Sequence, residues 1–177
     1  MSSNDVVAQL RSHIRDIPDF PKAGILFRDL TPLLADAKAL RLAIEPMAAP
    51  FRDDRIDCVL GTEARGFIFG TAVALELGAG FVPARKPGKL PYATIDATYD
   101  LEYGTDTVHI HVDGVAPGQR VLVVDDLIAT GGTAKATVEL AKRSGGDVVG
   151  CAFLIELDVL GGSAKLGVDR VHSVLHY

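Results

Sequence analysis

Cysteine is scarce in this chain of 177 residues, in which Cys58 and Cys151 are the only two. Each lies in an apolar run, and the sequence contains neither a CxxC pair nor a cluster of cysteine with histidine. This pattern argues against a disulfide framework. We therefore expect two buried free thiols and a reducing compartment.

Long apolar runs and an excess of positive charge are also missing. No segment reaches the roughly 18 consecutive apolar residues of a membrane span. Charged residues interrupt the N-terminus where a signal peptide would need its apolar core. The net charge of -5 argues against sequence-independent binding of nucleic acids. We expect a cytoplasmic protein that binds neither membranes nor nucleic acids.

What the sequence does have is the composition of an ordinary globular domain, with 48% hydrophobic and 23% charged residues. Its length favours one domain that spans residues 1–177 and has a single core. Hydrophobic periodicity, punctuated by glycine and proline, predicts helices and strands that alternate along the chain. The expected helices cover 4–16, 36–50, 67–78 and 132–146, and the expected strands cover 56–61, 80–86, 107–112, 120–126, 147–157 and 170–177.

This alternation predicts an α/β fold with a mostly parallel sheet and helices on both of its faces. The strand 107–112 is an exception, because its strict alternation of apolar and polar residues is typical of a half-exposed antiparallel strand. The segments 17–34 and 86–106 are rich in proline and glycine, and we expect both to be loops, the second with alternating character late in its length.

The stretch VLVVDDLIATGGT (121–133) combines a buried strand, two acids and a bare loop before a helix. Free N–H groups at the start of that helix favour an anion, and the glycines let a ligand approach the backbone. Asp125 and Asp126 suit ribose hydroxyls instead, either directly or through Mg²⁺. The stretch therefore predicts a sugar-phosphate site, with a phosphate monoester bound by Ala129, Thr130, Gly131, Gly132 and Thr133.

Cationic side chains follow two other expected strands. Arg65 comes after the strand 56–61, and Arg85, Lys86 and Lys89 come at or after the end of the next one. Ligands of open parallel sheets bind beyond the carboxyl ends of the strands, so these charges are expected at the same edge as the acids. Arginine and lysine there predict a site for a polyanion such as a diphosphate.

Three further patterns are weaker evidence for a binding site. GTEARGF (61–67) lacks the Lys-Ser/Thr of a P-loop, which disfavours a nucleoside triphosphatase. GAGFVP (78–83) closes a helix instead of opening one, so it is a poor dinucleotide fingerprint. His109 and His111 share one face of a strand, but the sequence offers no evident third ligand for a metal.

The stretch VLVVDDLIATGGT is similar to the phosphoribosyl-pyrophosphate motif of the type I phosphoribosyltransferases. FPKAGILFRDLTPLL, GTEARGFIFG, ARKPGKLP and YDLEYG resemble the adenine phosphoribosyltransferases within that family. The resemblance covers residues from about 17 to 156, with one departure at Ala23, where proline is expected. It implies a Rossmann-like twisted sheet with an N-terminal base-binding hood (about 1–35) and a mobile lid (about 86–106), in a homodimer.

The resemblance implies transfer of the 5-phosphoribosyl group from phosphoribosyl pyrophosphate to adenine, giving AMP and pyrophosphate with Mg²⁺ as the cofactor. It assigns the 5′-phosphate to 129–133 and the ribose hydroxyls to Asp125 and Asp126. It assigns the pyrophosphate to Glu63, Ala64, Arg65, Arg85, Lys86 and Lys89, with a Glu63–Ala64 peptide that is often cis in this family. Adenine would lie between Phe27 and Leu127, with its edge read by main-chain groups of Leu26 and Arg28.

The implied reaction gives several of these residues a chemical role. Breaking the bond from C1 to pyrophosphate builds charge on the leaving group, which cations such as Arg65 would stabilise. Water would intercept the oxocarbenium-like ribose, which explains a lid. Glu102, on that lid beside Tyr103, is the candidate to take the proton of the base. Arg85 is expected to reach the pyrophosphate of the neighbouring subunit.

Two alternatives use the same phosphate loop. A 6-oxopurine phosphoribosyltransferase would usually carry its base-reading residues late in the chain, whereas GILFRD (24–29) is early. A non-catalytic regulator that senses phosphoribosyl pyrophosphate and binds DNA would need a basic helical module, and the sequence contains none. An assay with adenine, hypoxanthine, guanine and orotate would separate the three.

Overall fold

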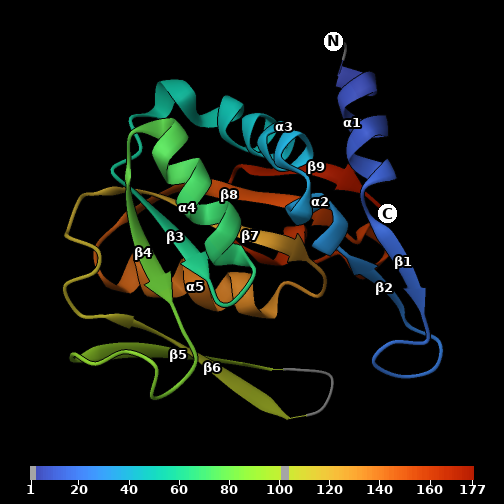
Figure 1. Ribbon diagram of the computed structural model, residues 1–177. Coiled ribbons are helices and arrows are strands. Elements are labelled where there is room, and N and C mark those ends of the chain that lie inside the picture. The colour runs from blue at the N-terminus through green and yellow to red at the C-terminus, as the bar shows by residue number, and fades with distance from the viewer. Residues whose placement is uncertain (1–2, 101–103) are drawn as a thin grey trace. The chain divides into compact units, whose positions relative to one another are not determined.

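The computed structural model of the chain describes residues 3–100 and 104–177 (Figure 1). Glu102 and Tyr103, the residues expected to act from the lid, lie outside the described residues. Contacts divide the chain into two compact units, Met1–Pro46 and Met47–Tyr177, and each is described by itself. The expected hood falls within the first unit, and the expected phosphate loop falls within the second.

The first unit contains a small hairpin where the sequence predicted a loop. Its elements are α1 (Ser3–Ser12), β1 (Arg15–Pro18), β2 (Leu26–Asp29), α2 (Thr31–Ala35) and α3 (Ala37–Ala48), which runs on into the second unit. The prediction of a loop over 17–34 is wrong, because β1 and β2 pair in antiparallel fashion and α2 follows them. Two cross-strand ion pairs support this register: Arg15 Nε lies 3.2 Å from Asp29 Oδ2, and Arg28 contacts Asp16.

The helix expected at 36–50 is confirmed as α3, and its start has a clear cause. The Asp36 carboxylate accepts hydrogen bonds from the backbone N–H groups of Lys38 (2.9 Å) and Ala39 (2.8 Å). These bonds satisfy two donors that a helix start leaves without partners. They are also the main reason that the pKa of Asp36 lies below its usual value.

The second unit is built round a parallel sheet of five strands, as the alternation predicted. The strand order is β4-β3-β7-β8-β9. The strands are β3 (Cys58–Thr62), β4 (Gly80–Ala84), β7 (Arg120–Ile128), β8 (Asp147–Glu156) and β9 (Val171–His176), with the helices α4 (Gly66–Leu77) and α5 (Gly132–Arg143). Short 3₁₀ turns complete the unit: η1 (Ala49–Asp54), η2 (Asp158–Leu160) and η3 (Ser163–Lys165).

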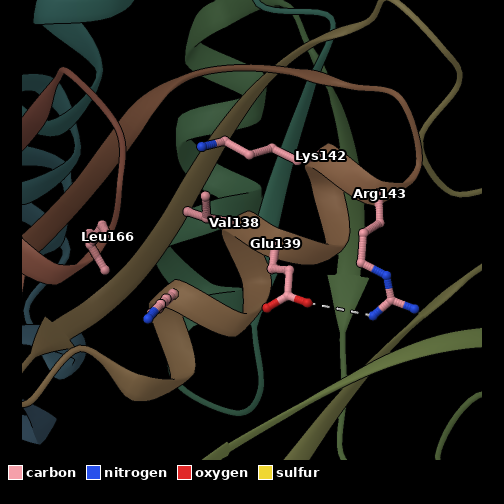
Figure 2. A pocket seen from close by; sticks show the side chains of 6 residues that line it. Val138, Glu139, Lys142, Arg143 and Leu166 are labelled. Carbon is pink, nitrogen blue, oxygen red and sulfur yellow. Dashed lines mark ion pairs between the residues drawn. The ribbon is translucent and has the colours of Figure 1, made fainter.

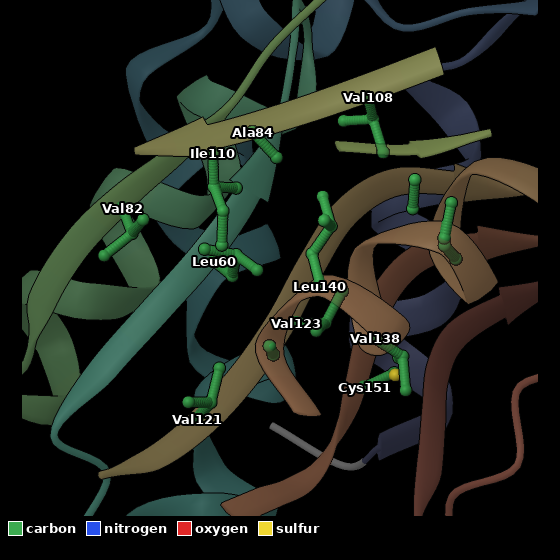
Figure 3. Packing of buried hydrophobic residues seen from close by; sticks show 14 of the residues in the cluster. Leu60, Val82, Ala84, Val108, Ile110, Val121, Val123, Val138, Leu140 and Cys151 are labelled. Atoms are coloured by element: carbon green, nitrogen blue, oxygen red, sulfur yellow. The ribbon is translucent and has the colours of Figure 1, made fainter. Parts of the chain in front are cut away.

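The two crossover helices place the core on both sides of this sheet. From the central strands, β3–α4–β4 runs to one edge and β7–α5–β8 runs toward the other, so right-handed connections put α4 and α5 on opposite faces. On the α5 face, Leu60 and Val123 from the sheet pack with Leu140 from the helix, all fully buried (Figure 3). Ile110 adds a contribution from outside the sheet to the same cluster.

That contribution comes from a hairpin that corrects the sequence prediction. The antiparallel strand expected at 107–112 is confirmed as β6 (Thr105–His111), but its partner β5 (Thr94–Asp100) occupies part of the segment assigned to a loop. Ala97 and Tyr99 of β5 are buried, only 3% and 8% exposed, in the same core cluster. The alternation late in this segment was visible in the sequence, but the proline and glycine residues at its start led to its assignment as a loop.

Both cysteines are buried and free, as expected. Burial raises the pKa of the Cys58 thiol to about 11 and that of the Cys151 thiol to about 12. Among the described residues, no helix is long and apolar enough to cross a membrane.

Candidate active site

The two acids of the sugar-phosphate motif lie on a strand that is longer than expected. The strand predicted at 120–126 continues to Ile128 because its pairing with β8 continues, from Asp125 opposite Phe153 to Ile128 opposite Glu156. Pairing with β3, on the other side, ends at Val124. Asp125 and Asp126 therefore lie where the sheet narrows by one strand, and the loop after β3 turns across them.

That loop supplies the cation nearest the acids. Arg65 Nε lies 2.7 Å from Asp126 Oδ2, and the Asp126 side chain is only 7% exposed. The Asp126 N–H donates to Asp125 Oδ1 at 2.9 Å. Gly66 leaves room for this carboxylate, because a Cβ on Gly66 would lie 2.4 Å from Asp125 Oδ1. The first turn of α4 can therefore begin directly against the acid.

Burial dominates the electrostatics of the pair. It raises the pKa of Asp125 well above the usual value, and the neighbouring Asp126 charge raises it further. Burial also raises the pKa of Asp126, although Arg65 opposes the shift. Two buried carboxylates with one guanidinium favour a partner that donates hydrogen bonds or carries positive charge. Ribose hydroxyls and a hard divalent cation such as Mg²⁺ both fit that requirement.

The loop Ala129–Thr133 connects β7 to α5 and lines a pocket of about 130 Å³. Gly131 precedes the helix with φ +85°, a left-handed conformation that side chains rarely adopt. A Cβ on Gly131 would also lie 2.6 Å from the Gly162 carbonyl oxygen. The loop is therefore compact, and the N-terminus of a 12-residue helix opens into it. This geometry suits a phosphate.

The turn that supports this loop was missed by the sequence analysis. A Cβ on Gly162 would lie 2.2 Å from the Ala129 carbonyl oxygen, so the two backbones touch. From the same turn, Lys165 Nζ donates to the Thr130 carbonyl oxygen at 3.2 Å. The available signal was the third Gly-Gly pair of the chain, at 161–162, followed by a lysine three residues later.

A second pocket, of about 320 Å³, adjoins the first, and the two pockets together collect most of the predicted residues. It is lined by Thr62, Glu63, Ala64, Arg65, Lys86, Asp125, Asp126, Leu127 and Thr133. Asp125, Leu127 and Thr133 line both pockets. The Glu63–Ala64 peptide at its wall is cis, as the resemblance implied. One continuous surface thus carries the loop 129–133, two acids and two cations.

Arg85 and Lys89 do not line this pocket but support its wall. Arg85 Nε lies 2.6 Å from Glu63 Oε2, and Arg85 Nη1 donates to the Lys89 carbonyl oxygen at 3.1 Å. The Lys86 N–H donates to Glu63 Oε1 at 3.1 Å. Burial alone would raise the pKa of Glu63, but the bonds from Arg85 and Lys86 outweigh it and lower the pKa. Glu63 is therefore an ionised anchor for the segment that follows β4.

The residues expected to hold a base are divided between the two units. Leu26, Phe27 and Arg28 form most of β2 in the first unit, and the Phe27 ring contacts Phe20 edge-on at 5.1 Å between centroids. Leu127 lies in the second unit, in the wall of both pockets. The expected enclosure of a base by Phe27 and Leu127 stays a prediction.

Two other features of the second unit lie apart from these pockets. A groove along α5 is lined by Lys135, Val138, Glu139, Lys142, Arg143 and Leu166, and Figure 2 shows Arg143 paired with Glu139 at 3.8 Å. Within the described residues, one group of possible metal ligands has its atoms within 4.8 Å of one another: Glu156, Asp158 and His176. His176 Nδ1 already contacts Asp158 Oδ1 at 2.8 Å.

Comparison with known proteins identifies the family. The phosphoribosyl transferase domain family matches residues 33–170. The adenine phosphoribosyltransferase of Rhodopirellula baltica is 60% identical over 168 residues, which cover 95% of this chain and 82% of the relative. This chain belongs to the adenine phosphoribosyltransferases. The relative from Methylococcus capsulatus is 59% identical, over 96% of this chain and 99% of its own length.

Solved adenine phosphoribosyltransferases share the fold. The crystal structure from Rhodothermus marinus superposes with a TM-score of 0.93 at 53% identity, covering 98% of this chain and 99% of the other. The enzyme from Saccharomyces cerevisiae, solved with an imino-altritol bisphosphate and adenine, gives 0.91 at 38% identity, covering 97% and 99%. The expected α/β fold of the type I phosphoribosyltransferases is thereby confirmed.

Replacing Gly131 with alanine tests the phosphate loop. The new Cβ would meet the Gly162 carbonyl oxygen and strain a left-handed residue, so the loop should open and lose its anion. We expect the Kd for ribose 5-phosphate, measured by calorimetry, to rise about tenfold or more. Gly118→Ala is the matched control, because Gly118 has φ +81° with nothing within 4 Å of its Cβ position. Equal affinities in the two variants would contradict the assignment.

Proposed function

We propose that this chain transfers the 5-phosphoribosyl group from phosphoribosyl pyrophosphate to adenine, releasing AMP and pyrophosphate. The observation that carries the proposal is the pair of adjoining pockets, which unite an anion loop, two buried acids and two cations. Membership of the adenine phosphoribosyltransferases supports adenine as the acceptor. A regulator that binds DNA is not favoured, since the net charge is -5.

The sugar phosphate would lie along the end of β7. The 5′-phosphate would accept hydrogen bonds from the N–H groups of the loop 129–133 at the start of α5. The ribose hydroxyls would donate hydrogen bonds to Asp125 and Asp126. The raised pKa values of Asp125 and Asp126 show that burial deprives their charged forms of hydration. Hydrogen bonds from ribose hydroxyls would replace part of that lost hydration, which favours this role. The carboxylates are also suitable donors for Mg²⁺, which supplies positive charge to the pyrophosphate when it is bound.

The pyrophosphate would occupy the wider pocket, beside Arg65 and Lys86. As the bond from C1 to pyrophosphate breaks, negative charge grows on the leaving oxygen, and fixed cations stabilise that charge more than the ground state. Arg65 is held by its ion pair with Asp126, so little reorganisation is needed. Exclusion of water from the site would protect the oxocarbenium-like ribose, and Glu102 would take or hold the proton of the base.

Base selection provides the direct test of the function. Main-chain groups of Leu26 and Arg28 would pair an N–H donor and a carbonyl acceptor with N1 and N6 of adenine. Hypoxanthine presents the opposite pattern, so buried mismatches should lower its kcat/KM by orders of magnitude. We expect turnover with adenine and little with hypoxanthine, guanine or orotate in an absorbance assay. Comparable kcat/KM for hypoxanthine would show that Leu26 and Arg28 of β2 do not read the base.

Asp125→Asn should separate activity from stability. Loss of the carboxylate should lower kcat about tenfold or more, since the ribose loses its charged acceptor. The free energy of unfolding should rise at neutral pH, because the buried charge is gone. As the pH falls through the raised pKa of Asp125, the wild-type acid takes up a proton in the folded state and the stability difference should shrink.

Urea titrations across this pH range measure the second effect, and Asp113→Asn is the control, because Asp113 is an exposed acid outside both pockets. An Asp125→Asn variant with normal kcat would remove the ribose assignment. A variant less stable than wild type at every pH would contradict the electrostatic argument.

We also propose a homodimer in which Arg85 reaches the pyrophosphate of the neighbouring subunit. Its absence from the lining of its own pocket supports this role. Refolding Arg65→Ala chains together with Arg85→Ala chains should then restore about a quarter of wild-type activity. About half of the dimers are mixed by random pairing, and in each mixed dimer one site keeps its own Arg65 and the partner's Arg85 but loses its own Arg85–Glu63 ion pair. Activity that stays at the level of the separate variants would rule out a shared site that needs only the partner's Arg85.

A further inference from the structure

Lys86 connects the wider pocket to the β5–β6 hairpin. It lines the pocket together with Arg65 and Asp125. Its ammonium donates to the Tyr99 hydroxyl at 2.8 Å and also contacts the Asp106 carboxylate. Tyr99 closes the triangle, because its hydroxyl donates to Asp106 Oδ2 at 3.2 Å. The lysine that faces the expected pyrophosphate is thus bound to two side chains of the hairpin.

Each corner of this triangle is fixed by a further contact. Tyr99 is only 8% exposed and sits in the core cluster, with its ring centroid 5.3 Å from Lys86 Nζ. The Thr107 N–H donates to Asp106 Oδ1 at 2.8 Å, so both oxygens of that carboxylate have partners. At the other end of the lysine, its backbone N–H is bonded to Glu63. The long side chain is therefore held from both ends.

Backbone bonds join the same two segments. Arg85, the residue before Lys86, forms an antiparallel bridge with His109 of β6. The two N–H to carbonyl distances of that bridge are 2.8 and 2.7 Å. The hairpin is therefore attached to the segment after β4 through its backbone as well as through the Lys86 side chain.

The chemistry of an ammonium leaves capacity for a ligand. Lysine has three N–H donors, and Tyr99 and Asp106 take two of them. A free lysine side chain would lose rotamer entropy on binding an anion, whereas Lys86 is already restricted. Burial alone would lower the pKa of Lys86, but Asp106 and Tyr99 outweigh it and raise the pKa. The Lys86 ammonium therefore stays charged in a fixed position, and its third N–H can donate to a ligand.

We propose that Tyr99 and Asp106 are positioning residues that hold the Lys86 ammonium in place for the departing pyrophosphate. This inference rests on the proposed function. Charge grows on the pyrophosphate as the bond to C1 breaks, so a cation fixed beforehand stabilises the transition state more than the bound substrate. The negative charge of Asp106 offsets part of the attraction of Lys86 for an anion. The benefit of the pair therefore comes from the fixed position of the ammonium, and it appears in kcat.

Double-mutant cycles test the coupling. We expect Tyr99→Phe and Asp106→Asn each to lower kcat about tenfold while the KM for adenine stays the same. In a Lys86→Met background, neither change should lower kcat further, because its effect passes through the ammonium. Tyr99→Phe keeps the buried ring and so preserves the fold if Asp106→Asn does not. A merely structural role would leave the same loss in both backgrounds.

The hairpin offers a matched control for each variant. Thr98→Val also removes one hydroxyl, from a pair in which Thr98 and Thr107 lie 3.2 Å apart. Asp96→Asn also removes one charge, at an exposed position on β5. Both controls should keep wild-type kcat. A rise in kcat/KM in Asp106→Asn would overturn the proposal, because it would mean that the carboxylate withholds Lys86 from the substrate.

Titration with pyrophosphate alone distinguishes failure of this inference from failure of the proposed function. If wild type turns over none of the four bases, the proposed function fails. The positioning role of Tyr99 is still tested in that case, by calorimetric titration with pyrophosphate in the absence of any base. It stands if Tyr99→Phe weakens pyrophosphate binding in the native background but not in Lys86→Met, with Thr98→Val unchanged. It is overturned if Tyr99→Phe binds as tightly as wild type, or if the loss persists without Lys86.

Discussion

The ion pair between Arg65 and the buried carboxylate of Asp126 fixes the loop after β3 across the end of β7. Without this guanidinium, two adjacent carboxylates would share a desolvated site with no opposing charge. The pair also determines where α4 begins, because Gly66 follows Arg65 directly and lies against the Asp125 carboxylate. One contact thereby links the two acids, the wall of the wider pocket and the start of a helix.

A second constraint acts between glycines. Gly131 and Gly162 approach so closely that a Cβ on either would meet the other segment. The phosphate loop is consequently shaped from behind, by a turn some thirty residues later in the sequence. In contrast to the ion pair, this contact depends on the absence of a Cβ at both glycines and not on charge. Together the two constraints hold the two adjoining pockets, one by attraction and one by close packing.

Much of this arrangement was predictable from local patterns. The continuous apolar runs gave the parallel strands, and the order of acids, glycines and helix in 121–133 gave the phosphate loop. The β1–β2 hairpin was missed because its strands have only four residues each and depend on ion pairs between them. β5 was missed because proline and glycine precede it.

The triangle of Lys86, Tyr99 and Asp106 joins residues 13 and 20 positions apart, and no local pattern marks such a contact. The assignment of adenine came from resemblance, not from periodicity or charge.

The two buried thiols carry a consequence for following this protein in solution. Cys58 of β3 and Cys151 of β8 lie on opposite sides of β7, opposite Val121 and Val123. With pKa values of about 11 and 12, neither is reactive as a thiolate near neutral pH while the sheet is intact. Alkylation of either one therefore reports an opening of the sheet. Since each thiol flanks a different side of β7, mass spectrometry of the labelled chain would distinguish loss of the β3 side from loss of the β8 side. The native cysteines therefore report which side of β7 opens first.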